Sequence, residues 1–313
     1  MKILFNKAEA GQDEVKALLG FMNADITYKN LEPDIELNTP YLVHFIGQAV
    51  YDKIATFYES SQTAEGFEVL KPILKCAQLY ILLIAYLEYA SNGDLNHGNN
   101  GRKAIFAANE KTPWDWQIKA DNGALERRAY KALDLLIDLL TTAAYTEWIT
   151  SEPYKAAKAL FIPTTNSFQK IYPINHSGQL FYRLVPFMAD IEQENILAIL
   201  GEVKYLELKS GTPATIPLID FNLLTSYCQK IAAYLVIDRA WRILPEEMLG
   251  ETVNYKLSDH ARADLRDKRS IEHLARVKVY ERDLQAILAR LDLEVYDYDQ
   301  THGIDPANKY LNL

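Results

Sequence analysis

The residues best suited to metal binding or nucleophilic catalysis, six histidines and two cysteines, are scattered along this chain of 313 residues. No histidine has a His or Cys partner three or four residues away, which is the spacing that a metal site on one helix requires. Cys76 and Cys228 lie in apolar helical patterns without a CxxC pair, so we expect two buried thiols in a reducing compartment. The phosphate-binding, nucleophile-elbow and HExxH motifs of common enzymes are also missing from the sequence. We therefore expect no catalytic, cofactor-binding or metal-binding residues.

The polar stretch DLNHGNNG, residues 94–101, has the closest resemblance to a metal-binding loop. Asp94 and Asn96 suit the first and third positions of a calcium loop, but the turn glycine is misplaced and Ile105 stands where a glutamate is required. We expect a plain polar loop instead. His97, within it, is a candidate contact residue.

Aromatic side chains are the strongest indication of binding. Trp114 and Trp116 lie in TPWDWQIK, residues 112–119, directly after the long polar loop 91–111. Strand-like alternation would place both tryptophans and Ile118 on one face, so we expect a short extended piece that ties the loop onto neighbouring helices. A partner-facing role and a ligand platform are the alternatives. The 20 tyrosines, among them Tyr296 and Tyr298 near the C-terminus, suggest an abundance of contact surface.

The elements that would position these residues are helices, because apolar residues recur at helical spacing and glycine is scarce. We expect an all-α fold, mainly, with extended loops and small β elements. Helices are predicted over 13–19, 39–58 (with Pro40 in its first turn), 67–89, 125–150 and 151–160. Leu133, Leu136 and Leu140 should be buried on one helix face. The uncharged segment 76–87 is shorter than the roughly 20 residues that span a membrane, so it predicts a buried core helix.

The order of elements restarts halfway along the chain, which suggests an internal duplication of one helical bundle. Phe45 and Phe187, Cys76 and Cys228, and Tyr130 and Tyr280 would be equivalent pairs. The alternative is a chance alignment of amphipathic helices. The expected parts are a first helical unit over residues 1–150, a second over 151–291, and a C-terminal arm over 292–313 that is either extended against another chain or poorly ordered.

The acidic net charge argues against tight binding to nucleic acid. The net charge is −9, whereas a protein that binds duplex DNA usually presents a basic face. The helical region 261–290 is locally basic, and a solvated face with internal ion pairs accounts for it. No apolar segment at the N-terminus is long enough for a signal peptide, so we expect a cytoplasmic rather than secreted protein.

Two segments, residues 112–140 and 160–201, with the phrase AWRILP at 240–245, resemble the head-to-tail connector (neck or adaptor) proteins of tailed phages. The likeness is to the large forms in phages and prophages of Bacteroidetes. It implies a non-enzymatic virion protein that forms a ring with copies of itself between the portal and the tail or neck proteins. It also implies assembly in the bacterial cytoplasm, possible passage of DNA through the ring, and no membrane. The alternatives are a glycan-binding helical protein, which the Tyr and Trp content suggests, and a helical enzyme with a site assembled from scattered residues.

Overall fold

A computed structural model describes residues 2–8, 11–21, 26–60, 67–93, 95–98, 101–104, 114–244 and 259–302. The described part is mainly α-helical, which confirms the predicted fold class. The chain divides into two compact units. Unit 1 comprises residues 1–156 and 176–182, and unit 2 comprises residues 157–175 and 183–313. The division therefore lies near the predicted boundary, although a short later segment belongs to unit 1.

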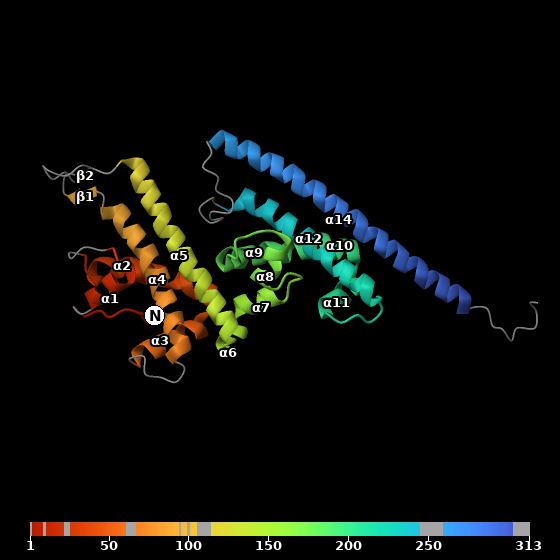
Figure 1. Ribbon diagram of the computed structural model, residues 1–313, viewed down its shortest axis with the longest axis horizontal. Helices are drawn as coiled ribbons and strands as arrows, with labels where there is room; N and C mark the ends of the chain where they lie inside the picture. Colours follow the sequence, from red (N-terminus) through yellow and green to blue (C-terminus); the bar gives the residue numbers. More distant parts are fainter. Residues whose placement is uncertain are drawn as a thin grey trace, which may run out of the picture. The chain divides into compact units, whose positions relative to one another are not determined.

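Unit 1 is built around two long neighbouring helices, α4 and α5 (Figure 1). Its helices are α1 (Gly11–Leu19), α2 (Tyr28–Ile46), α3 (Gln48–Glu59), α4 (Phe67–Gly93), α5 (Asp115–Ala143), α6 (Thr146–Ile149) and most of α7 (Glu152–Lys158). A short antiparallel hairpin, β1 (Leu95–Gly98) and β2 (Gly101–Ala104), pairs Leu95 with Ala104.

Unit 2 is built around a second long antiparallel pair, α12 and α14 (Figure 1). Its helices are α8 (Thr165–Ile171), most of α9 (Gly178–Ile191), the π-helix η1 (Glu192–Ile196), α10 (Leu197–Leu200), α11 (Glu202–Ser210), α12 (Leu218–Ile243) and α14 (Asp259–His302).

Helix α4 is the central core helix of unit 1. By length and composition alone, its span Glu68–Asn92 would be apolar enough to cross a membrane, but 61% of it is buried inside the protein. Ile81, Leu82 and Leu83 are fully buried, as the prediction of a core helix required. The predicted burial of Leu133, Leu136 and Leu140, and of Cys76 and Cys228 in their bundles, is also confirmed.

Four predicted elements differ from the structure. The helix expected over 125–150 is α5, which begins ten residues earlier at Asp115 and ends at Ala143, followed by the short helix α6 (Thr146–Ile149). The helix expected over 39–58 is the end of α2 and all of α3, separated by Gly47 at φ 85° and ψ 152°, a conformation open essentially to glycine alone. The WDWQI segment is not extended, because α5 begins at Asp115 and the Gln117 side chain accepts a hydrogen bond from the Trp114 N–H at 3.0 Å. Residues 292–302 continue helix α14 rather than forming an arm.

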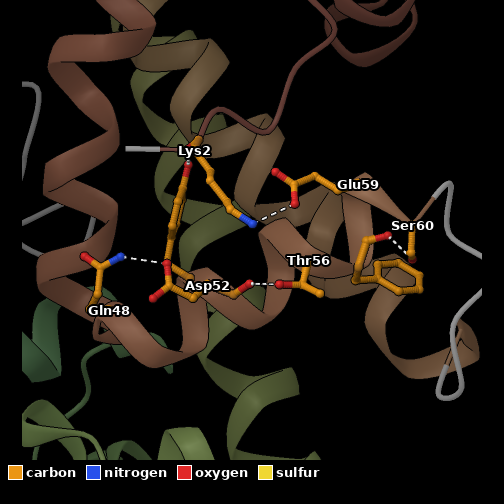
Figure 2. A network of polar contacts seen from close by, with 8 residues as sticks. Lys2, Gln48, Asp52, Thr56, Glu59 and Ser60 are labelled. Carbon is orange, nitrogen blue, oxygen red and sulfur yellow. Dashed lines mark hydrogen bonds and ion pairs between the residues drawn. The ribbon is translucent and has the colours of Figure 1, made fainter.

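Each unit begins with a segment held to its bundle by polar contacts. In unit 1, the Lys2 carbonyl accepts a hydrogen bond from the Tyr51 hydroxyl at 2.6 Å, and Lys2 Nζ lies 2.6 Å from Glu59 (Figure 2). The Leu4 carbonyl accepts a hydrogen bond from Gln78 Nε2 at 2.6 Å. These bonds satisfy backbone groups that would otherwise be buried without partners.

Unit 2 repeats this arrangement. The Phe161 carbonyl accepts a hydrogen bond from Gln229 Nε2 at 2.9 Å, and its N–H donates to Glu192 Oε1 at 2.6 Å. Gln78 of α4 and Gln229 of α12 thus each donate to a backbone carbonyl at the start of their own unit. The pairing of Cys76 with Cys228 stays a prediction.

The glycine breaks also correspond. Gly201 joins α10 to α11 with φ 72° and ψ 162°, as Gly47 joins α2 to α3 with φ 85° and ψ 152°. The predicted pairing of Phe45 with Phe187 is out of register with these breaks, because Phe45 lies just before Gly47 whereas Phe187 lies in the middle of α9.

If unit 2 is aligned with unit 1 on its buried positions, the part of the chain that contains η1 has one residue more than the corresponding part of α2. Ile35 of α2 matches Met188 of α9, 153 residues later, whereas Ile46 matches Leu200, 154 residues later. All four side chains are buried. A π-helical turn, closed by i→i+5 hydrogen bonds, contains one residue more than an α-helical turn. The helix segments before and after η1 therefore turn the same face towards the core.

Candidate functional site

Large apolar side chains are exposed on α11 and on the first turns of α12. Val203 and Leu206 lie one turn apart on α11, and Leu218, Ile219 and Leu223 lie on the first turns of α12. Val203 is 75% exposed and Ile219 is 71% exposed. We call these five side chains together the α11–α12 apolar surface. Exposed aliphatic side chains one turn apart on a helix, such as Val203 and Leu206 or Ile219 and Leu223, form local apolar faces, which are typical of contact surfaces.

A single carboxylate fixes the loop that joins the two helices. Glu207 Oε1 accepts hydrogen bonds from the backbone N–H groups of Ala214, Thr215 and Ile216 at 2.7, 2.8 and 2.8 Å, and Glu207 Oε2 accepts one from the Thr215 hydroxyl. Partial burial opposes ionisation, but the hydrogen bonds from Thr215 and the three backbone groups outweigh it and lower the pKa of Glu207 to about 2. The apolar surface is therefore held in one arrangement before any partner binds, which lowers the entropic cost of association.

The positions of α3 that correspond to Val203 and Leu206 lack large apolar side chains. Counting from the two glycine breaks, Val203 and Leu206 correspond to Ala49 and Asp52 of α3. The Asp52 carboxylate accepts a hydrogen bond from Gln48 Nε2 at 2.9 Å, and its backbone carbonyl accepts one from the Thr56 hydroxyl (Figure 2). The two units have similar helices here, but the exposed side chains at these positions differ.

A second face shows the opposite difference. In unit 1, Leu37 and Tyr41 lie one turn apart on α2 and are exposed. The corresponding positions of unit 2, Asp190 and Glu194, are acidic and pair with Arg239 at 3.8 and 2.6 Å. At these two pairs of positions, one unit exposes large apolar side chains and the other does not.

Aromatic rings fill the seam between α12 and α14 in unit 2. His273 stacks on Trp241 with ring centroids 4.8 Å apart, and Tyr234 and Tyr172 meet His273 edge-on at 5.2 and 5.4 Å. Tyr234 is in turn 5.9 Å from Tyr280. Several of the tyrosines whose number suggested contact with other molecules therefore pack inside unit 2 instead.

His273 is a buried ring in this seam. Burial lowers its pKa, and Arg269 and Arg276 lower it further, against the raising effects of Asp238 and Glu272. Among the described residues, Nδ1 of His273 and Nε1 of Trp241 have no hydrogen-bond partner. The ring is closely enclosed by aromatic neighbours, so we assign it a packing role.

Glu192 is the most deeply buried carboxylate of the described part that takes part in a network. Burial raises its pKa, and the ammonium group of Lys209, which donates a short hydrogen bond to it, lowers it. Glu192 also accepts hydrogen bonds from the Phe161 N–H at 2.6 Å and the Tyr205 hydroxyl at 3.5 Å. Because both carboxylate oxygens accept hydrogen bonds, Glu192 holds the backbone at Phe161, near the start of unit 2, against α11.

The predicted contact residues lie on elements of both units. Trp114 and Trp116 are 71% and 65% exposed, so the prediction that they anchor the loop by packing on the helices is wrong. Their role in an interface stays a prediction. His97 lies in β1, and Tyr296 and Tyr298 lie in the last turns of α14, but their side chains are outside the described part.

The sequence analysis missed the α11–α12 apolar surface. The pair Leu218-Ile219, directly after Pro217, could have indicated this surface. Adjacent residues of a helix point in different directions, so a helix covered on one side leaves one of the two exposed. Glu207 was also missed, because its partners are backbone groups that the sequence does not mark.

Among the described residues, no group of three or more His, Cys, Asp or Glu side chains is placed to hold a metal ion. Comparison of the chain with protein-family models, with curated proteins and with solved structures gave no match.

Proposed function

We propose that the protein is a non-enzymatic structural subunit that assembles with copies of itself into a ring. The observation that carries this proposal is the pair of exposed apolar faces, Leu37–Tyr41 on unit 1 and the α11–α12 apolar surface on unit 2. A contact between two different surfaces of identical chains is heterologous, and repeating it closes a ring when the rotation permits. Both faces lie on ordered helices.

The internal duplication belongs to this proposal. Matching glycine breaks, matching glutamines at the start of each unit and matching buried positions support a common origin for the two units. A duplicated unit gives one chain two scaffolds of the same kind. Separate substitutions on each scaffold then provide two different contact faces.

Within this class of protein, we propose a head-to-tail connector or adaptor in the virion of a tailed phage, assembled in the cytoplasm of the bacterial host. Its partners would be the portal and the tail or neck proteins. The net charge of −9 suits a ring through which DNA passes, because an acidic surface does not hold the phosphate backbone tightly.

The test is the assembly of the purified chain, alone and mixed with a phage portal, followed by light scattering and electron microscopy. We expect rings, and we expect Ile219→Asp or Leu37→Asp to weaken association by at least about tenfold, because losing one buried aliphatic side chain costs roughly 1.5–3 kcal/mol. Leu135→Asp is the matched control, since Leu135 is an exposed apolar residue outside both faces. A chain that stays monomeric at all concentrations and binds no portal or neck component would contradict the proposal.

A glycan-binding protein is the second candidate, and the exposure of Trp114 and Trp116 favours it. Exposed indole rings stack on the apolar faces of sugars. A glycan array would then show binding that Trp114→Ala and Trp116→Ala remove. An array without any bound glycan would eliminate this candidate.

A further inference from the structure

His273 lies between two arginines on one side of α14. Arg269 precedes it by four residues and Arg276 follows it by three, a spacing that makes side chains neighbours on a helix. The guanidinium carbon of Arg269 lies 5.8 Å from the ring centre of Trp241. That of Arg276 lies 5.6 Å from the ring centre of Tyr234. The aromatic seam between α12 and α14 therefore already holds two cations against its rings while His273 is neutral.

The two carboxylates whose charge acts on His273 are engaged with arginines. Asp238 of α12 lies 3.2 Å from Arg242, and Glu272 of α14 lies 2.8 Å from Arg276. A carboxylate that already neutralises a guanidinium group attracts a further cation less than a free carboxylate does. A proton taken up by His273 thus adds a positive charge to the seam without adding a counter-ion.

Burial withholds water from the ring of His273. The residue is 6% exposed, and Tyr172, at the end of α8, and Tyr234 of α12 meet its ring edge-on. Neither tyrosine carries a charge near neutral pH. Within the described part of the chain, Nδ1 of His273 has no hydrogen-bond partner, and an imidazolium has an N–H to satisfy at each of its nitrogens. A buried charge without such a partner is far more costly than a neutral ring.

We propose that the α12–α14 seam is an acid-sensitive latch, in which protonation of His273 loosens α14 from α12 and exposes the aromatic side chains between them. Burial, with a contribution from the two flanking arginines, lowers the pKa of His273 below its ordinary value of 6.5 in the closed seam. Well above pH 6.5 the ring is neutral whether the seam is closed or open, and the latch keeps its full stability. As the pH falls below 6.5, the open seam binds the proton more readily than the closed seam, so acid favours opening. The latch concerns packing within unit 2 alone and does not depend on the proposed function.

Fluorescence of Trp241 tests the latch in the full chain. With Trp114, Trp116 and Trp148 replaced by Phe, Trp241 is the only tryptophan, and at 5% exposure it is shielded from acrylamide while the seam is closed. We expect the quenching constant for acrylamide to rise when the pH is lowered from about 7.5 to about 5, while the helix content measured by circular dichroism stays unchanged. A quenching constant that does not change with pH overturns the latch.

His273→Phe in the same chain is the matched control. It keeps an aromatic ring in the seam but cannot bind a proton, so the quenching constant should stay low at both pH values. Glu192, a buried carboxylate of the same unit, is present in both chains, so the comparison isolates His273. An equal rise in both chains overturns the latch, because another group would then cause the opening.

Amide hydrogen exchange of the unaltered chain is a second measurement that needs no substitution. After correction for the intrinsic effect of pH on exchange, α14 should exchange faster relative to α4 at about pH 5 than at about pH 7.5. An unchanged ratio overturns the latch, even where His273→Phe fails to fold. Ring assembly is decided by light scattering and electron microscopy, so failure of the latch and failure of the proposed function are distinguishable.

Discussion

At the scale of the residue, Glu207 has the clearest electrostatic role. Its carboxylate organises the loop before α12, and its folded-state pKa of about 2 lies below its ordinary value of 4.5. Between these two pH values the unfolded chain binds the proton more readily than the folded chain. The stabilisation is therefore complete above about pH 4.5 and disappears as the pH falls towards 2.

Glu207→Gln should lower the free energy of unfolding by about 1 kcal/mol at pH 7, a value kept small because the side chain is partly exposed to solvent. The measurement is urea unfolding of both proteins at pH 7 and at pH 3. The difference between them should shrink at the lower pH. An equal difference at both pH values would show that the charge of Glu207 does not stabilise the loop.

At the scale of the element, the two glycine breaks decide where helices end. Gly47 and Gly201 both adopt a positive φ with ψ near 155°, and a side chain there costs roughly 1–3 kcal/mol. Gly201→Ala should show this backbone cost alone, because the added methyl group meets nothing within 4 Å. Gly47→Ala should cost more, since its Cβ would lie 3.1 Å from Cβ of Ser151.

Chemical denaturation of the two alanine variants measures this difference, and Gly123→Ala serves as the control. Gly123 lies inside α5 with an ordinary φ, so alanine there should not destabilise the chain by backbone strain. Equal losses of stability in all three variants would contradict the role assigned to the breaks.

At the scale of the whole molecule, the two units should unfold separately. Each has its own internal packing, and chains with separate cores depart from two-state unfolding. Trp148, buried in unit 1, and Trp241, buried in unit 2, allow the two events to be followed by fluorescence. With Trp114 and Trp116 replaced by Phe in both proteins, Trp241→Phe leaves the first reporter and Trp148→Phe leaves the second.

Gly47→Ala should shift the transition of unit 1, and Gly201→Ala should shift that of unit 2. The tryptophan variants assign each transition to its unit. One coincident transition that both alanine variants shift by the same amount would mean that the two units unfold as one.

The sequence by itself determined the helical class, a core helix over 67–89 and the buried faces of α4, α5 and α12. These follow from local spacing, because apolar residues three and four apart must share a side of a helix and be buried together. The internal duplication that the sequence suggested stays a prediction. Residue identities alone did not reveal the π-helical turn η1, which appears only in the folded chain.

The tertiary structure alone decided which apolar residues stay outside. Trp114 and Ile219 are as apolar as Trp148 and Ile231, yet the first two are exposed and the second two are buried. Exposure depends on which neighbouring helix covers a face, and that neighbour comes from a distant part of the chain. For the same reason the ion pairs that join α14 to α11 and α12 appear only in the folded chain, where residues far apart in sequence meet. The loop around Glu207 is local in sequence, but its bonds go to backbone groups that residue types do not mark.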